Sequence, residues 1–213
     1  MKTIKFLLKG LLFVMGIGAA AWVFMPWKQV GESVLLLAGK RLASPSSIVY
    51  SSIEGVPGGF VVEDLDVRRL MGIVDVSFRT LTIVPDIAAS LTNMAPTCRI
   101  AFTGSALGEI SVTPRKKIPG ITFGNGRVAV SFNRQGILLE ELRSDGDLSM
   151  NGSFLVAPFA NPIIGWASVT LDVKSEPFEQ ELPSLQMALG LPLQQDTPGR
   201  WFLRRTLTQG ETS

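Results

Sequence analysis

Residues 72–84 read GIVDVSFRTLTIV, and this stretch indicates the fold of the chain. Within it, apolar Val74, Val76 and Phe78 alternate with polar or charged residues. Successive side chains of a β-strand point to opposite faces, so a period of two predicts a strand in a sheet with one wet face. The chain is therefore expected to contain an antiparallel sheet whose other face is apolar.

Similar runs lie on both sides of this stretch, with Gly, Pro, Asn or Asp between them. This punctuation is typical of an all-β domain. Further strands are predicted over residues 48–53, 60–67, 100–103, 109–113, 121–133, 136–143, 147–156, 166–174 and 200–206. Turns or loops are predicted over residues 55–59, 104–108, 114–120 and 144–146, the last as an Asp-Gly hairpin.

Three short helices are expected around the sheet. Residues 29–42 place Val30, Val34, Leu37 and Ala38 on one side of a helix that either lies at the membrane surface or packs under the following domain. Residues 85–93 predict a short helix or turn beginning at Pro85. Residues 182–189 predict an amphipathic helix placed to close the open end of a curved sheet. The fold class is mainly β, a curved antiparallel sheet with short helices.

The amino-terminal region predicts a membrane segment. Residues 10–27 carry no charge, and crossing the hydrocarbon core takes ~20 mostly apolar residues. Lys2, Lys5 and Lys9 precede them, which keeps the amino end in the cytoplasm. The interpretation is a single-pass protein of the bacterial inner membrane with its carboxy-terminal domain in the periplasm.

A cleavable signal peptide is the rival interpretation, because Ala19–Ala21 satisfy an A-x-A cleavage rule. A retained anchor is favoured because the apolar run continues through residues 22–25. Trp22 and Trp27 also suit an aromatic belt, with Pro26 ending the helix. Gly16 and Ala20 form a small-xxx-small pair, which marks either a helix–helix contact face, as in a homo-oligomer, or only the general frequency of Gly and Ala in membrane helices, and the second interpretation is favoured.

The expected organisation has five parts. Residues 1–9 are a cytoplasmic basic region, 10–27 a transmembrane helix, and 28–47 a juxtamembrane helix and linker. Residues 48–207 are a periplasmic β domain, and 208–213 a disordered tail.

Composition excludes several function classes. The chain has no His, which removes Ser-His-Asp and Cys-His catalysis and most zinc sites. The net charge is +2, or −1 without the three amino-terminal lysines, so nothing predicts nucleic-acid binding. The lone Cys98 cannot form an internal disulfide and is expected to be buried in its strand.

Neither a catalytic nor a metal site, and no cofactor, is predicted. Glu140 and Glu141 are adjacent and point to opposite faces of a strand. Asp145 and Asp147 are explained by turn chemistry, and the glycines of residues 124–126 lack the third glycine of a dinucleotide site.

Two candidate interaction sites follow from the pattern. The first is an apolar face, either a closed core or a groove for acyl chains. Its residues are Val74, Val76, Phe78, Val128, Val130, Phe132 and Val169. The second is a basic loop for anionic lipid heads or an acidic partner, unless it is only a solvated loop. Its residues are Arg115, Lys116 and Lys117.

Several short motifs resemble the type II secretion system protein N (GspN) family. They are the anchor ending at Pro26-Trp27, SIEG at 52–55, TGSALG at 103–108, LGLP at 189–192 and PGRW at 198–201. The resemblance implies a non-enzymatic inner-membrane accessory that contacts other secretion components. It also implies a long curved sheet like that of periplasmic lipid-transfer proteins.

That likeness supplies an alternative, a membrane-anchored lipid-transfer protein that holds acyl chains against the apolar face. Loss of the secretion accessory would stop export of folded substrates and leave lipid composition normal. The lipid carrier would instead co-purify with phospholipid or lipopolysaccharide. An anchored hydrolase ranks last, since no S-x-x-K sequence lies in a suitable helix.

Overall fold

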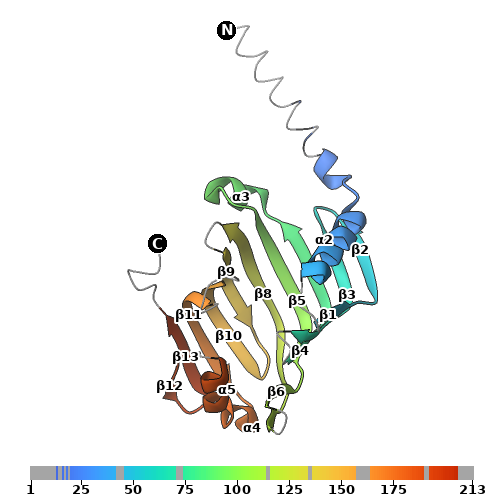
Figure 1. Cartoon of the computed structure of the whole chain (residues 1–213). Helices are drawn as coiled ribbons and strands as arrows, with labels where there is room; N and C mark the ends of the chain where they lie inside the picture. The colour runs from blue at the N-terminus through green and yellow to red at the C-terminus, as the bar shows by residue number, and fades with distance from the viewer. Residues whose placement is uncertain are drawn as a thin grey trace.

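In the computed structural model of the chain, most of the described residues form antiparallel β-strands, and a few short helices lie around them (Figure 1). The structure describes residues 13, 16, 18, 20–41, 46–70, 74–113, 116–133, 136–156, 164–189 and 192–205. The predicted mainly β fold class is confirmed. Seven residues of the predicted membrane segment 10–27, namely 10–12, 14, 15, 17 and 19, lie outside the described residues. Among those described, no helix has the length and apolar character needed to cross a membrane.

The main sheet has eleven strands in the described part of the chain. They are β1 (Ser47–Val49), β2 (Ser52–Val56), β3 (Gly59–Leu70), β4 (Val74–Pro85), β5 (Thr97–Leu107), β8 (Ile121–Asn133), β9 (Gly136–Ser144), β10 (Leu148–Val156), β11 (Ile164–Val173), β12 (Leu193–Thr197) and β13 (Arg200–Arg205). Their order is β1-β3-β4-β5-β8-β9-β10-β11-β13-β12, with β2 also on β3. A second, two-stranded sheet joins β6 (Ile110–Thr113) to β7 (Lys116–Ile118).

The sheet has two ends that matter for function. At one end, called here the α3 end, helix α3 (Ile87–Asn93) connects β4 to β5. At the other, called here the β6 end, lie β6, β7 and the helices α4 (Glu176–Glu179) and α5 (Leu182–Leu189) (Figure 1). β5 connects the two ends and has 11 residues, so they are ~35 Å apart.

Helix α2 (Trp27–Arg41) packs against β2 and β3, so the second of the two placements expected for residues 29–42 is confirmed. The side that faces the sheet carries Trp27, Gly31 and Leu35, and all three are buried. A Cβ at Gly31 would lie 2.7 Å from Phe60 Cδ2, so only glycine permits this close approach. Val30, Val34 and Leu37 share one side of the helix as expected, but this side does not pack on the sheet, since Val34 and Leu37 are exposed.

The placement of Trp27 in an aromatic belt was also wrong. Its ring is 4 % exposed and lies in the core, where Nε1 donates to the carbonyl oxygen of Trp22 at 2.9 Å. The two indole rings meet edge to face, with centroids 4.6 Å apart. This pair attaches the carboxy-terminal part of the predicted membrane segment to the β domain.

One large apolar cluster, called here the main cluster, extends along the sheet. Its buried members include Phe60 and Val62 of β3, Phe102 of β5, and Trp201 and Leu203 of β13. Helices at opposite ends also contribute, α2 through Trp27 and Leu35, and α4 and α5 through Phe178, Leu182 and Leu185. The predicted helix over residues 182–189 is therefore confirmed, and it covers the apolar face at the β6 end.

Single residues with left-handed backbone interrupt the alternation of four strands. They are Asp64 and Arg69 in β3, Gly104 in β5, Gly124 in β8 and Glu141 in β9, with φ of 48°, 51°, 55°, 63° and 53°. The pairing register shifts around all of them except Asp64. An extra residue in one strand is a β-bulge, which bends the strand and increases its twist. Buried neighbours around a bulge are then three residues apart, as Phe102 and Ser105 are. The predicted turn over residues 104–108 was wrong for this reason, because β5 runs on through Gly104.

Three other expectations are corrected. The predicted strand over residues 48–53 is two strands, β1 and β2, both paired with β3. Residues 116–118 of the predicted loop form β7. Pro85 is the last residue of β4, and Asp86 rather than Pro85 begins the helical segment as the N-cap of α3.

Candidate functional site

The seven residues of the predicted apolar face belong to two adjoining clusters. Val169 is buried in the main cluster, and Val74, Val76 and Phe78 pack against it half-buried. Val128 and Val130 form a second cluster with Leu142. Phe132 is 48 % exposed.

The two clusters form one continuous face. Ile100, Met150 and Phe154 pack against both, and Val128 lies directly opposite Ile100 in the strand pairing. Val128, Val130 and Val169 are 8 %, 6 % and 5 % exposed. The protein's own side chains therefore cover the middle of this face.

Cys98 lies in β5 against the second cluster and is half-buried rather than fully buried. Burial raises the pKa of its thiol because it disfavours the charged thiolate. Thiolate is the reactive form, so Cys98 is expected to react slowly with iodoacetamide at pH 8 in the folded chain and faster in urea. Mass spectrometry of timed samples measures both rates. Equal rates would contradict this placement.

The predicted basic loop is only partly described. Arg115 lies outside the described residues, and for Lys116 only the backbone, in β7, is described. Lys117 Nζ is 2.6 Å from Glu109 Oε1, with both side chains largely exposed. This pair lies at the β6 end of the sheet.

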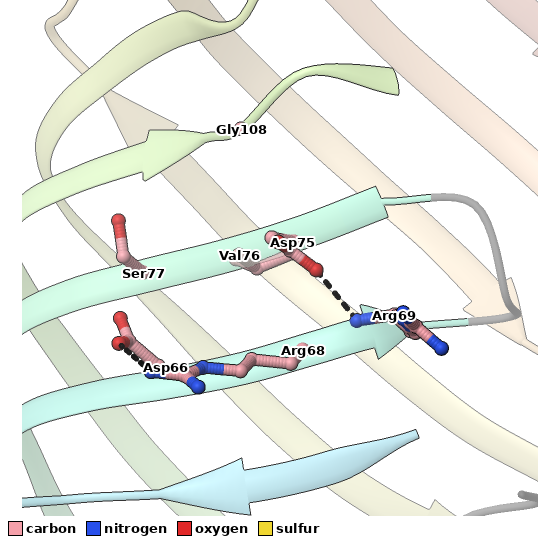
Figure 2. Close-up of a pocket in the computed structure, with 7 residues that line it drawn as sticks. All are labelled: Asp66, Arg68, Arg69, Asp75, Val76, Ser77 and Gly108. Atoms are coloured by element: carbon pink, nitrogen blue, oxygen red, sulfur yellow. Dashed lines mark hydrogen bonds and ion pairs between the residues drawn. The ribbon is translucent and has the colours of Figure 1, made fainter. Parts of the chain in front are cut away.

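A polar cleft of about 500 Å³ lies where β3 ends and β4 begins, next to Gly108 (Figure 2). Its lining residues are Asp66, Arg68, Arg69, Asp75, Val76, Ser77 and Gly108. Figure 2 shows Asp75 pointing at the backbone of Arg69, whose N–H donates to Asp75 Oδ1 at 2.6 Å. Arg68 Nη2 is 3.7 Å from Asp66 Oδ2. These contacts compensate charge within the cleft and hold the strand ends together.

Other polar residues singled out by sequence stabilise the bulged region. Asp145 Oδ1 accepts a hydrogen bond from the Asn125 backbone N–H at 2.7 Å, and Asp147 Oδ2 accepts one from Thr122 Oγ1 at 2.7 Å. Asn125 Oδ1 accepts from the Gly104 N–H at 3.2 Å. Both carboxylates therefore bond to residues of β8, 20 and 25 positions away in the chain, and these contacts are not the local turn bonds that the sequence analysis expected of Asp145 and Asp147. No group of three or more His, Cys, Asp or Glu side chains within the described residues is placed to hold a metal ion.

An apolar stripe, called here the α2 stripe, runs along the outer side of α2. Val34 and Leu37 are 46 % and 55 % exposed, and Val30 lies beside them half-buried. With Pro26, Gln29 and Ser33 they line a shallow groove of about 350 Å³. The spacing i, i+4, i+7 is that of a helix side that docks against another helix.

Helix α3 is a second exposed apolar feature, which the sequence analysis missed. None of its residues is buried, and Ile87, Leu91 and the C-cap Met94 are 48 %, 75 % and 95 % exposed. These residues again have i, i+4, i+7 spacing. The spacing of these three apolar residues could have indicated an apolar side of α3 from the sequence. The segment was predicted only as a short helix or turn.

The N-cap Asp86 fixes α3 on the sheet. Its Oδ1 accepts from the Ala89 N–H at 2.9 Å, and its Oδ2 is 2.7 Å from Arg99 Nε. The Ala89 hydrogen bond, aided by the Arg99 charge, lowers the pKa of Asp86.

A lowered pKa makes α3 sensitive to acid. The cap's stabilisation is fully present above the ordinary pKa of 3.8 and is lost as pH falls through the lower folded value. Amide hydrogen exchange of Ala89 and Ser90 is therefore expected to speed up relative to the sheet at low pH, and at neutral pH in Asp86→Ala. Asp172→Ala, which breaks an exposed ion pair with Arg200, is the control. Unchanged exchange in Asp86→Ala would show that the cap does not hold the helix.

A comparison with protein families identifies the family to which this chain belongs. Residues 3–205 match the family described as type II secretion system protein GspN-like, Synergistales. The chain belongs to this GspN-like family. No curated protein and no solved structure matches it.

Membership of the GspN-like family confirms the resemblance drawn from the short motifs. It implies a place in the bacterial envelope and association with other type II secretion components.

Proposed function

We propose that the chain is an accessory component of the type II secretion system, working by protein contacts without catalysis. An apolar anchor that begins at residue 10 and ends before the core residue Trp27 holds it in the inner membrane. The carrying observation is the family match, which begins at residue 3 and so includes the predicted anchor. In this proposal the amino end of the chain lies in the cytoplasm, and the β domain lies in the periplasm.

The α2 stripe is the proposed contact surface for another inner-membrane component of the system. It follows residues 10–27 directly, so it lies within reach of a partner anchored in the same membrane. Exposed apolar side chains in a row along a helix gain free energy when a partner covers them. The Lys117–Glu109 pair and the polar cleft lie at the β6 end, where a soluble periplasmic domain would meet them.

A secretion assay tests this function. Val34→Asp with Leu37→Asp is expected to reduce export of a folded type II substrate toward the level of a gene deletion, because the charges block docking. Met187→Asp is the matched control, since Met187 is 80 % exposed on α5 at the β6 end. Normal export in the deletion strain would overturn the secretion role.

Site-specific photo-crosslinking identifies the occupant. A photoreactive residue at position 37 is expected to crosslink to an inner-membrane secretion component, and one at 187 is not. A crosslink to a second copy of the chain would indicate a homo-oligomer. Normal export in the α2 variant together with no crosslink would overturn the assignment of the contact surface.

The lipid-transfer alternative needs an open apolar groove. Val128, Val130 and Val169 are covered by neighbouring side chains, so this alternative has less support than the secretion role. Mass spectrometry of organic extracts from the purified chain tests it. Stoichiometric phospholipid or lipopolysaccharide that survives exchange into lipid-free detergent would favour lipid transfer.

A further inference from the structure

The apolar side of α3 points away from the protein. Apolar residues of a helix normally pack on the core, yet Ile87, Leu91 and Met94 are all at least 48 % exposed. Phe132, 48 % exposed, lies at the same end of the sheet, where its backbone N–H donates to the Pro96 carbonyl at 2.9 Å. These four residues, called here the α3 tip, form an apolar projection.

The base of this projection is polar and well bonded, so the exposure of the tip is fixed by the structure. Thr97 is 6 % exposed, and its N–H donates to Ser90 Oγ at 2.8 Å. Ser90 Oγ in turn donates to the Asp86 carbonyl at 2.6 Å. Arg99 pairs with Asp86 on the same strand end. Turning α3 to bury Leu91 would break these bonds.

The α3 tip lies at the end of the sheet where the chain leaves the predicted membrane segment. The turn at Gly58 joins β2 to β3, and a Cβ there would lie 3.2 Å from Trp22 Nε1. The adjacent Gly59 packs against Val84, close to the start of α3. Figure 1 shows α3 at the ends of β5 and β8 opposite to β6. Trp22 and α3 therefore share one end.

We propose that the α3 tip inserts into the surface of the lipid bilayer as a second membrane contact of the β domain. The proposal rests on the proposed anchor that begins at residue 10. Residues 87–96 carry no charge, and an interfacial helix buries its apolar side while its polar side stays in water. A projection without a groove suits a fluid surface better than a protein partner, which needs complementary shape. Two contacts fix the tilt of the sheet relative to the membrane.

Depth-dependent fluorescence quenching tests the contact. The full chain, with Cys98→Ser and Leu91→Cys, carries a bimane label and is reconstituted in vesicles of phosphatidylethanolamine and phosphatidylglycerol. Lipids brominated on the acyl chains are the quencher. The label at residue 91 is expected to lose roughly half of its fluorescence, since interfacial helices insert ~5–10 Å. The matched control places the label at Met187→Cys, ~35 Å away along the sheet, where no quenching is expected.

Carbonate extraction of the same vesicles separates this proposal from the anchor. A chain that stays in the membrane with a quenched label at 91 and an unquenched label at 187 supports the α3 contact. A retained chain with equal signals at both positions overturns the α3 contact alone. A chain released by carbonate overturns the anchor and the α3 contact together. Protection of residue 91 by a second protein without bromine quenching would assign the tip to a protein partner and overturn the proposal.

Discussion

Phe102→Ala is expected to destabilise the β domain by about 3–5 kcal/mol, as is usual for removing a buried aromatic ring. Phe102 is 5 % exposed in β5, at the middle of the sheet. Its ring meets Phe78 and Phe123 edge to face, with centroids 5.9 Å and 5.7 Å away. Phe78 and Phe123 also meet, at 5.8 Å. The substitution removes two of three contacts in this triad, and a whole domain is stable by only ~5–15 kcal/mol.

Urea unfolding of the full chain in mild detergent, followed by tryptophan fluorescence, measures the effect. The matched control is Phe132→Ala, because Phe132 lies on neighbouring β8 and is 48 % exposed. Its cost in detergent is expected within about 0.5 kcal/mol, as for exposed sites in general. Equal unfolding midpoints for the two variants would show that the triad does not organise the core.

Gly124→Val is expected to destabilise the domain by about 2–4 kcal/mol, combining left-handed strain with a lost hydrogen bond. Gly124 has φ of 63°, which a β-branched residue rarely adopts. A Cβ there would lie 2.6 Å from Asp145 Oδ1, displacing the carboxylate that accepts from Asn125. The same unfolding measurement applies.

Glu141→Gly tests the same kind of backbone position in the opposite direction, because it replaces a larger residue with glycine. Glu141 already has φ of 53° in β9, so glycine relieves strain there while adding freedom to the unfolded chain. The two terms oppose each other, and the net change is expected within about 1 kcal/mol. A loss at 141 as large as that at 124 would mean that side-chain packing, rather than backbone conformation, determines stability at the bulges.

These bulges explain why alternation in the sequence predicted some parts of the strands correctly and failed in others. In β5, Cys98, Ile100 and Phe102 alternate with exposed residues, but the buried residue that follows is Ser105, three positions on across Gly104. Period-two reasoning has no term for a bulge, and a glycine in a strand resembles a turn. Gly104 was therefore interpreted as the start of a turn, although it lies inside a continuous β5.

Two further strands were missed because they carry almost no apolar pattern. β12 has one buried residue, Leu193, followed by four exposed polar ones. β7 lies between Pro114 and Pro119, which argued for a loop. Both strands are held by pairing with a neighbouring strand, β12 with β13 and β7 with β6. The residues of a single strand do not show which strand it will pair with.

The position of the interaction surfaces depends on which side of each helix faces outward, and the sequence alone does not decide this. The i, i+4, i+7 lines on α2 and α3 are visible as apolar spacing. Whether such a line faces the core is decided by the strand that the helix meets. On α2 the sheet takes the side of Trp27, Gly31 and Leu35, so the line at Val34 and Leu37 remains outside.

The strand order has a consequence for the time course of biogenesis. β13 follows β12 in the chain, yet it lies between β11 and β12. A ribosome therefore delivers the edge strand before the strand that attaches it, and Trp201 and Leu203 reach the core after nearly every other strand. Until then β11 has an unpaired side, which is a site for mispairing or for a chaperone. A stop codon just before Arg200 would make that exposed intermediate permanent.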